Sequence, residues 1–114
     1  MNVLVIDVGG THVKVLATGR RTPVKIPSGP QMMAEQMVQE VLAATTGWHY
    51  EAVSIGYPGP VANNTPLREP ANLGGGWVGF PFEAAFGHPV KVINDAAMQA
   101  LGHYKGGRMN QRGS

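Results

Sequence analysis

The segment of residues 3–14 limits the possible folds of this chain more than any other part. It opens with a short apolar run that ends at Asp7, and Gly9-Gly10 follow almost at once. The run predicts a buried strand, the glycine pair predicts a tight turn, and the alternating residues 12–18 predict an antiparallel return strand. The plain interpretation is a β-hairpin whose glycines are needed only because the turn requires positive φ angles.

The spacing Asp-x-Gly-Gly-Thr-x-x-Lys also fits a phosphate site. Bare backbone N–H groups at the glycine turn and the Thr11 hydroxyl can donate to phosphate oxygens. Lys14 supplies a positive charge. Asp7 at the strand end suits a Mg²⁺ ion bound through water, because Mg²⁺ keeps several waters beside one or two carboxylates. The pattern therefore predicts that acid, turn, hydroxyl and cation belong to one phosphate-binding motif.

The rest of the chain alternates strands and helices. Expected strands lie at residues 2–7, 12–18, 22–26, 51–56 and 89–93, and expected helices run from Ser28-Gly29-Pro30 to about Thr46, from 82 to 86 and from 96 to 104. Residues 60–81 are expected to form a long irregular loop, which is unusual in a compact domain unless it is functional or well packed. Strands separated by helices favour parallel pairing, so the expected fold class is α/β in a single domain.

Each of the three buried strands ends in a polar motif. The first ends at Asp7, the second runs into Gly56-Tyr57-Pro58-Gly59, and the third ends at Asn94-Asp95. Parallel strands place their carboxyl ends together, where α/β sheets bind ligands. Each motif also has a structural explanation, because the second reads as a turn and the third as a helix N-cap. Their convergence favours a crevice that contains two carboxylates.

Phosphoryl transfer fits this set of side chains. It is catalysed mainly by positioning and charge stabilisation, together with a carboxylate that takes the proton of the acceptor hydroxyl. Asp95 is the candidate base, and Asn94 can hydrogen-bond a hydroxyl of the acceptor. The Gly74-Gly75-Gly76-Trp77 segment would close over a hydroxyl-rich ligand, although such a tryptophan is more often part of the core. The four histidines lack the spacing of metal ligands.

Composition excludes several other classes. The sequence has no cysteine, which rules out disulfides and thiolate metal sites and is compatible with a cytoplasmic protein. Its nine basic residues are scattered apart from Arg20-Arg21, so we expect no nucleic-acid partner. The N-terminal apolar run is too short for a signal peptide or a membrane span, so we expect no membrane partner.

Four segments together resemble the ROK sugar kinases, a family of the actin/hexokinase/Hsp70 ATPase superfamily. They are Asp7 to Lys14, similar to its first phosphate motif; Ile55 to Val61, similar to its glycine-proline sugar segment; Asn72-Leu73 followed by Trp77; and Val92 to Ala97, which contains the Asn-Asp pair. The resemblance spans nearly all of residues 3–104. It is strongest to the glucokinase and polyphosphate glucokinase branch.

The resemblance implies a ribonuclease H-like mixed sheet and phosphorylation of a hexose, most often glucose, with Mg²⁺ and with ATP or polyphosphate as donor. It implies that Asp95 is the catalytic base. It also implies two sets of binding residues: Gly59, Asn72, Asn94 and Asp95 for the sugar, and Gly9, Gly10, Thr11 and Lys14 for phosphate, with Asp7 holding Mg²⁺ through water.

Several family features are not found in this sequence, namely a second phosphate loop, a nucleotide pocket, further sugar ligands and a cysteine-rich zinc motif. We therefore expect residues 1–105 to be the N-terminal lobe of a kinase, and residues 106–114 to be a flexible tail with the composition of a cloning scar. The isolated chain should turn over little or no substrate. It should form dimers or aggregates through the apolar face that a C-terminal lobe would cover.

Two other functions share the fold. A repressor-type ROK protein would bind sugar without kinase activity, but it carries an N-terminal helix-turn-helix, whereas the first strand here is expected from residue 2. An actin-like assembly protein would not be expected to keep the sugar-site motifs. The choice between ATP and polyphosphate stays open.

Overall fold

The structure is a computed structural model and describes residues 1–96. Its elements are β1 (Val3–Val8), β2 (His12–Ala17), β3 (Val24–Pro27), α1 (Ala34–Ala44), β4 (Ala52–Tyr57), β5 (Val61–Ala62), β6 (Thr65–Pro66), α2 (Phe82–Phe86) and β7 (Val90–Asn94). The expected helix over 96–104 lies outside the described residues except for Ala96, which is helical, and the end of the expected lobe at 105 and the expected tail over 106–114 lie outside them entirely. Within residues 1–96, no helix has the length and apolar character needed to cross a bilayer.

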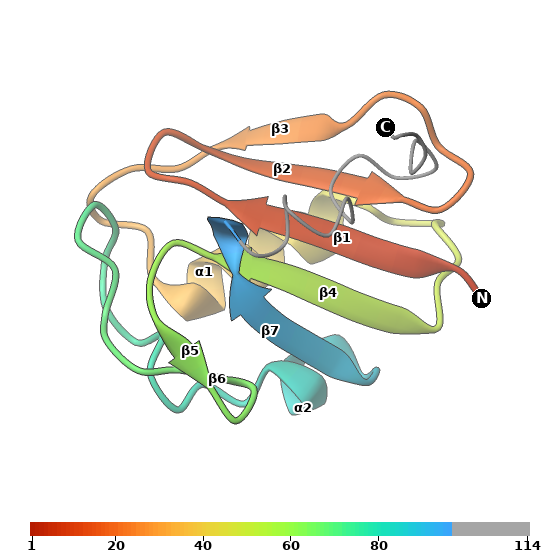
Figure 1. The fold of residues 1–114 in the computed structure, drawn as a ribbon. Coiled ribbons are helices and arrows are strands. Elements are labelled where there is room, and N and C mark those ends of the chain that lie inside the picture. The colour runs from red at the N-terminus through yellow and green to blue at the C-terminus, as the bar shows by residue number, and fades with distance from the viewer. Residues whose placement is uncertain (97–114) are drawn as a thin grey trace.

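The main sheet has the strand order β3-β2-β1-β4-β7 (Figure 1). The first three strands form an antiparallel meander, with Val8 opposite Val13 and Val13 opposite Ile26. The strands β1, β4 and β7 run parallel. The sheet is therefore mixed, as expected, and the carboxyl ends of its three parallel strands lie at one end.

One face of the sheet forms the core because alternate strand residues point to the same side. In β1, Leu4, Ile6 and Val8 are fully buried, whereas the intervening residues are half-buried. Helices α1 and α2 contact one another, and α1 lies behind the sheet in Figure 1. The buried residues of α1 join the same cluster: Ala34, Met37, Val38 and Val41.

The start of α1 differs from the sequence prediction. The helix begins at Ala34, not at Ser28-Gly29-Pro30, and its N-cap Met33 makes no side-chain cap hydrogen bond. Ser28 is tied to the β1–β2 turn instead, because its hydroxyl donates to the Gly9 carbonyl at 2.7 Å and its backbone N–H donates to the Thr11 carbonyl at 3.0 Å.

The expected irregular loop over residues 60–81 contains an unpredicted hairpin, β5–β6. Its turn residues Asn63 and Asn64 have φ angles of 52° and 63°. Two successive residues in the left-handed region are typical of a type I′ hairpin turn, and asparagine tolerates that region better than most residues. The Asn-Asn pair was the sequence signal for this hairpin. The short helix α2 ends as predicted at Gly87, whose φ is 73°.

Candidate functional site

The predicted phosphate turn is a tight hairpin connection between β1 and β2. The Gly9 N–H donates to the His12 carbonyl at 3.0 Å. Neither Gly9 nor Gly10 has a positive φ, so the interpretation that the turn needs these glycines only for positive φ angles was wrong. Close approach requires them instead: a Cβ on Gly9 would lie 2.9 Å from the His12 carbonyl oxygen, and one on Gly10 would lie 3.1 Å from the Asn72 Cβ.

Ser28 holds this turn from the neighbouring strand, a role that the sequence interpretation missed. Its hydroxyl donates to the Gly9 carbonyl, and its backbone N–H donates to the Thr11 carbonyl at 3.0 Å. The Thr11 side chain itself is exposed and lies 3.3 Å from the His12 imidazole Nδ1. The antiparallel register of β2 and β3 could have revealed this contact, because it pairs His12 with Pro27 and so brings Ser28 to Thr11.

The two predicted carboxylates lie within electrostatic range of one another, as the effect of Asp95 on Asp7 indicates. Asp7 lies at the end of β1, half-buried and opposite Lys14 in the β1–β2 ladder. Burial raises the pKa of the Asp7 carboxyl, the negative charge of Asp95 raises it further, and Lys14 opposes both effects. The first and last strands of the parallel set therefore bring their acids close enough to interact, with Lys14 beside them.

Asn94 connects the second and fourth motifs. Its side-chain amide donates to the Gly59 carbonyl at 2.7 Å, and its Oδ1 accepts from the Ala96 N–H at 3.0 Å. Asn94 is therefore a helix N-cap, and helical backbone begins at Asp95. One N–H and one lone pair of the amide are not used by these two bonds and can meet a ligand.

Asn72 brings the third motif to the phosphate turn. Its side chain lies close against Gly10, because a Cβ added to Gly10 would be 3.1 Å from the Asn72 Cβ. A small cleft of about 60 Å³ lies at this junction. It is lined by residues of three motifs and their neighbours: Gly10, Pro58, Pro70, Ala71, Asn72 and Leu73. The four motifs thus contact one another in pairs.

Trp77 belongs to the core and does not form a sugar platform. Its side chain is fully buried, with ring centroids 5.9 Å from Tyr57 and 6.5 Å from Phe82. Its indole N–H has no hydrogen-bond partner among residues 1–96. The tryptophan therefore anchors the loop that carries Asn72 and has no free face for a ligand.

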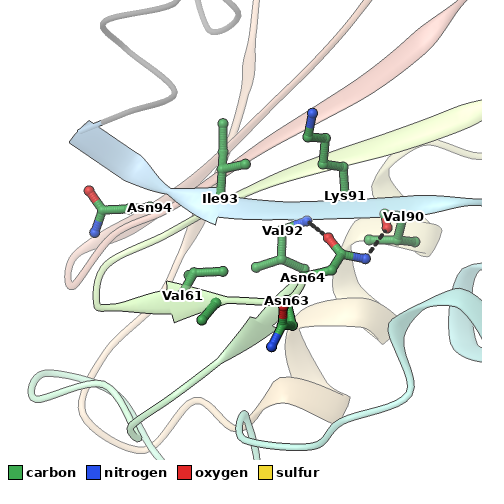
Figure 2. A pocket seen from close by; sticks show the side chains of 9 residues that line it. Val61, Asn63, Asn64, Val90, Lys91, Val92, Ile93 and Asn94 are labelled. Atoms are coloured by element: carbon green, nitrogen blue, oxygen red, sulfur yellow. Dashed lines mark hydrogen bonds between the residues drawn. The ribbon is translucent and has the colours of Figure 1, made fainter.

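A larger groove of about 580 Å³ runs beside β7, between the β5–β6 hairpin and Asn94 (Figure 2). Asn64 closes one side of it. Its amide donates to the Val90 carbonyl at 2.8 Å and its Oδ1 accepts from the Val92 N–H at 2.6 Å, so one side chain pairs with the strand as a neighbouring strand would. The groove reaches the site only at Asn94.

Known proteins were compared with this chain in sequence and in fold. No family model and no curated protein matches the sequence. Among solved structures, a ROK family glucokinase from Streptomyces griseus in complex with glucose and AMPPNP aligns with 97% of this chain and 38% of its own, at 28% identity and a TM-score of 0.72. A ROK hexokinase from Thermus thermophilus aligns with 90% of this chain and 39% of its own, at 28% identity and a TM-score of 0.67.

A ROK family protein from Streptococcus pneumoniae in complex with sucrose shares the fold, with a TM-score of 0.70 at 22% identity. Over nearly its whole length the chain is thus similar to part of these ROK family sugar kinases, which supports its resemblance to the N-terminal portion of such a kinase. The chain spans about two fifths of the length of the glucokinase and the hexokinase that it matches.

Proposed function

We propose that this chain is the first lobe of a ROK sugar kinase that transfers a phosphoryl group from ATP or polyphosphate to a hydroxyl of glucose or a related hexose. The fold would then be the ribonuclease H-like fold of that superfamily. The observation that carries the proposal is the convergence of Asp7 and Asp95 next to the Gly9–Thr11 turn. A kinase needs these elements together: a carboxylate for the acceptor, another for the metal, and donors for phosphate.

In this proposal Asp95 is the general base that accepts the proton of the sugar hydroxyl. It is half-buried, and it directly follows Asn94, which hydrogen bonds fix on both sides. That fixed backbone supports the use of Asp95, because a base must lie within hydrogen-bond reach of its proton. Asn94, Gly59 and Asn72 would form the part of the sugar site that this lobe contributes.

The residues around Asp7 fit a Mg²⁺ ion. Two interacting carboxylates with one nearby lysine leave negative charge that a cation can neutralise. Residues 1–96 contain no group of three or more histidine, cysteine, aspartate or glutamate side chains that could hold a metal by themselves. Mg²⁺ needs no such cage, since one or two carboxylates with waters and substrate phosphates suffice. The bound ion would neutralise phosphate charge, and Asp7 would hold it through water.

The phosphate end of the donor would lie at the hairpin turn. Thr11 presents an exposed hydroxyl there, and Ser28 fixes the backbone of the turn. Lys14, opposite Asp7, adds positive charge. The complex of the Streptomyces griseus glucokinase with AMPPNP, an ATP analogue, favours ATP as donor. Polyphosphate is the alternative that the assay below separates from it.

The partner required for turnover is a C-terminal lobe, because the similar kinases are more than twice the length of this chain. The isolated chain should show little or no glucose phosphorylation. It should self-associate, as a homodimer or a larger species, through the face that such a lobe covers. Sedimentation at high concentration tests this, and a clean monomer counts against it.

The decisive experiment uses the longer gene product that the proposal requires. Glucose phosphorylation is measured with ATP and with polyphosphate in wild type, Asp95→Ala and Asp95→Asn, and Lys91→Ala serves as an exposed control on β7. Both Asp95 variants should fold but lose transfer by about 10²–10⁴-fold, as expected for removal of a general base. Unchanged rates in folded Asp95→Asn would overturn the assignment.

A further inference from the structure

The loop between β6 and α2 has no regular structure, yet it holds a fully buried side chain, Trp77. Something other than a strand ladder must fix its backbone. Glu69 does so through both carboxylate oxygens. Oε1 accepts from the Trp77 N–H at 2.9 Å, and Oε2 accepts from the Val78 N–H at 3.2 Å. We call this arrangement the Glu69 clamp.

The clamp closes the loop into a ring. It joins residues that are eight and nine positions apart in the chain. Hydrogen bonds to an ionised carboxylate are stronger than those between neutral groups, and two oxygens on two successive N–H groups also fix direction. The residue before Glu69 is held as well, because the Tyr57 hydroxyl donates to the Arg68 carbonyl at 2.5 Å.

Two further bonds hold the middle of the ring against the segment before α1. The Gly74 N–H donates to the Met32 carbonyl at 2.8 Å, and the Ala34 N–H donates to the Gly75 carbonyl at 3.4 Å. Asn72 lies between these bonds and the clamp. Its side chain therefore has a fixed approach to the Gly10 turn, where a Cβ added to Gly10 would lie only 3.1 Å from the Asn72 Cβ.

The charge of Glu69 also affects the ring interior. Tyr57 is buried beneath the loop, and burial, followed by the negative charge of Glu69, raises the pKa of its hydroxyl to about 12. Tyr57 thus stays a neutral donor to the Arg68 carbonyl throughout the ordinary pH range. Carboxylate, phenol and tryptophan are thus linked within the loop that carries Asn72.

We infer that Glu69 is a positioning residue, which holds the Asn72 side chain against the phosphate turn by closing the ring from residue 69 to residue 78. A contribution of Glu69 to catalysis rests on the proposed function, in which Asn72 contacts the sugar. The effect of Glu69 on the position of the Asn72 side chain is independent of that function, so the two can be tested separately.

The first test uses NMR of the 114-residue chain, wild type and Glu69→Ala, without any ligand. Glu69→Ala should abolish the nuclear Overhauser effect between Gly10 Hα and Asn72 Hβ. It should also reduce the hydrogen-exchange protection of the Trp77 and Val78 amides at least tenfold, while β1 and β4 amides keep theirs. Glu83→Gln is the control, because Glu83, in α2, binds one backbone N–H, that of Val90 at the start of β7.

Glu69→Gln should keep one of the two bonds, because its amide has a single acceptor oxygen. Protection should therefore persist at one of the two amides and be lost at the other. A retained Gly10–Asn72 contact in folded Glu69→Ala would overturn the inference, and so would a loss of protection that spreads equally over the sheet.

The second test measures the longer kinase with glucose. Glu69→Ala should raise KM for glucose several-fold with a smaller change in kcat, and Glu83→Gln should change neither. If wild type fails to phosphorylate glucose, the proposed function fails, while the NMR result still decides the clamp. If wild type is active and KM is unchanged in Glu69→Ala, the positioning role fails and the proposed function stands.

Discussion

Gly74→Ala is expected to destabilise the chain far more than the same change at the next residue. A Cβ on Gly74 would lie 2.7 Å from the Gln31 carbonyl oxygen, 2.9 Å from the Gln31 carbonyl carbon and 3.0 Å from the Met32 carbonyl oxygen. All three are backbone atoms, so no side chain can rotate away. A Cβ on Gly75 would meet no atom within 4 Å. The two alanine variants therefore differ in whether the added Cβ clashes with the Gln31–Met32 backbone.

The size of the effect follows from the displacement. Ordinary contact with the Gln31 oxygen requires that the loop move by about 0.7 Å. Such a shift lengthens the 2.8 Å bond between the Gly74 N–H and the Met32 carbonyl beyond the normal range. Overpacking of a filled site costs about 1–3 kcal/mol, and a lost hydrogen bond costs about 0.5–1.5 kcal/mol. We expect a loss of about 2–4 kcal/mol in the free energy of unfolding.

The Gly75→Ala variant should lie within about 0.5 kcal/mol of wild type, because its added Cβ meets no neighbouring atom. Urea denaturation of both variants, followed by circular dichroism, measures the difference. With a slope of about 2 kcal/mol per molar urea, the midpoint of Gly74→Ala should fall by about 1–2 M. Equal midpoints for the two variants would refute the reasoning, because the loop would then not be packed on the Gln31–Met32 backbone.

Three further predictions concern the site and its surroundings. Asp7→Asn should stabilise the chain at neutral pH, because burial and the charge of Asp95 raise the pKa of Asp7 in the folded state. Ionisation of Asp7 therefore costs wild type stability as the pH rises above about 3.8. The advantage of the variant should vanish below that pH in urea titrations. Ser28→Ala removes the 2.7 Å bond to the phosphate turn and should cost about 0.5–1.5 kcal/mol, with loss of amide protection at the turn. Asn64→Gly keeps the positive φ but removes both bonds to β7, so thermal unfolding should show a loss of about 1–3 kcal/mol, whereas Asn63→Gly should change little.

The sequence was sufficient to predict most of the regular structure. The apolar run that ends at Asp7, the alternation in residues 12–17 and the glycine pair between them predict the first hairpin, and the structure confirms it. The order of strands and helices predicts the mixed sheet, because parallel strands need long connections and antiparallel strands do not. These features depend on local propensity and on the period of apolar residues, both of which can be read from one sequence.

The contacts that hold the site could not be predicted in the same way. Ser28 resembled a helix cap until its true partner, the Gly9 carbonyl, was known. Glu69 carries no local signal, since its partners are backbone N–H groups, which every residue except proline offers. Side chains that bind distant backbone leave no pattern in composition or spacing. Only the folded arrangement reveals them.

The position of β7 at the end of the described sheet has a consequence for local unfolding. The β1–β2–β3 meander joins neighbouring strands through short turns, whereas β7 must return across a long loop to reach β4. Edge elements generally open at lower free energy than central ones, and among residues 1–96 β7 pairs with β4 alone, supported by side-chain bonds from Asn64 and Glu83 and by the burial of Val90 and Val92. Opening of β7 alone would remove Asp95 and leave the phosphate turn intact. The lobe would therefore lose its proposed catalytic acid–base group well before it lost its fold.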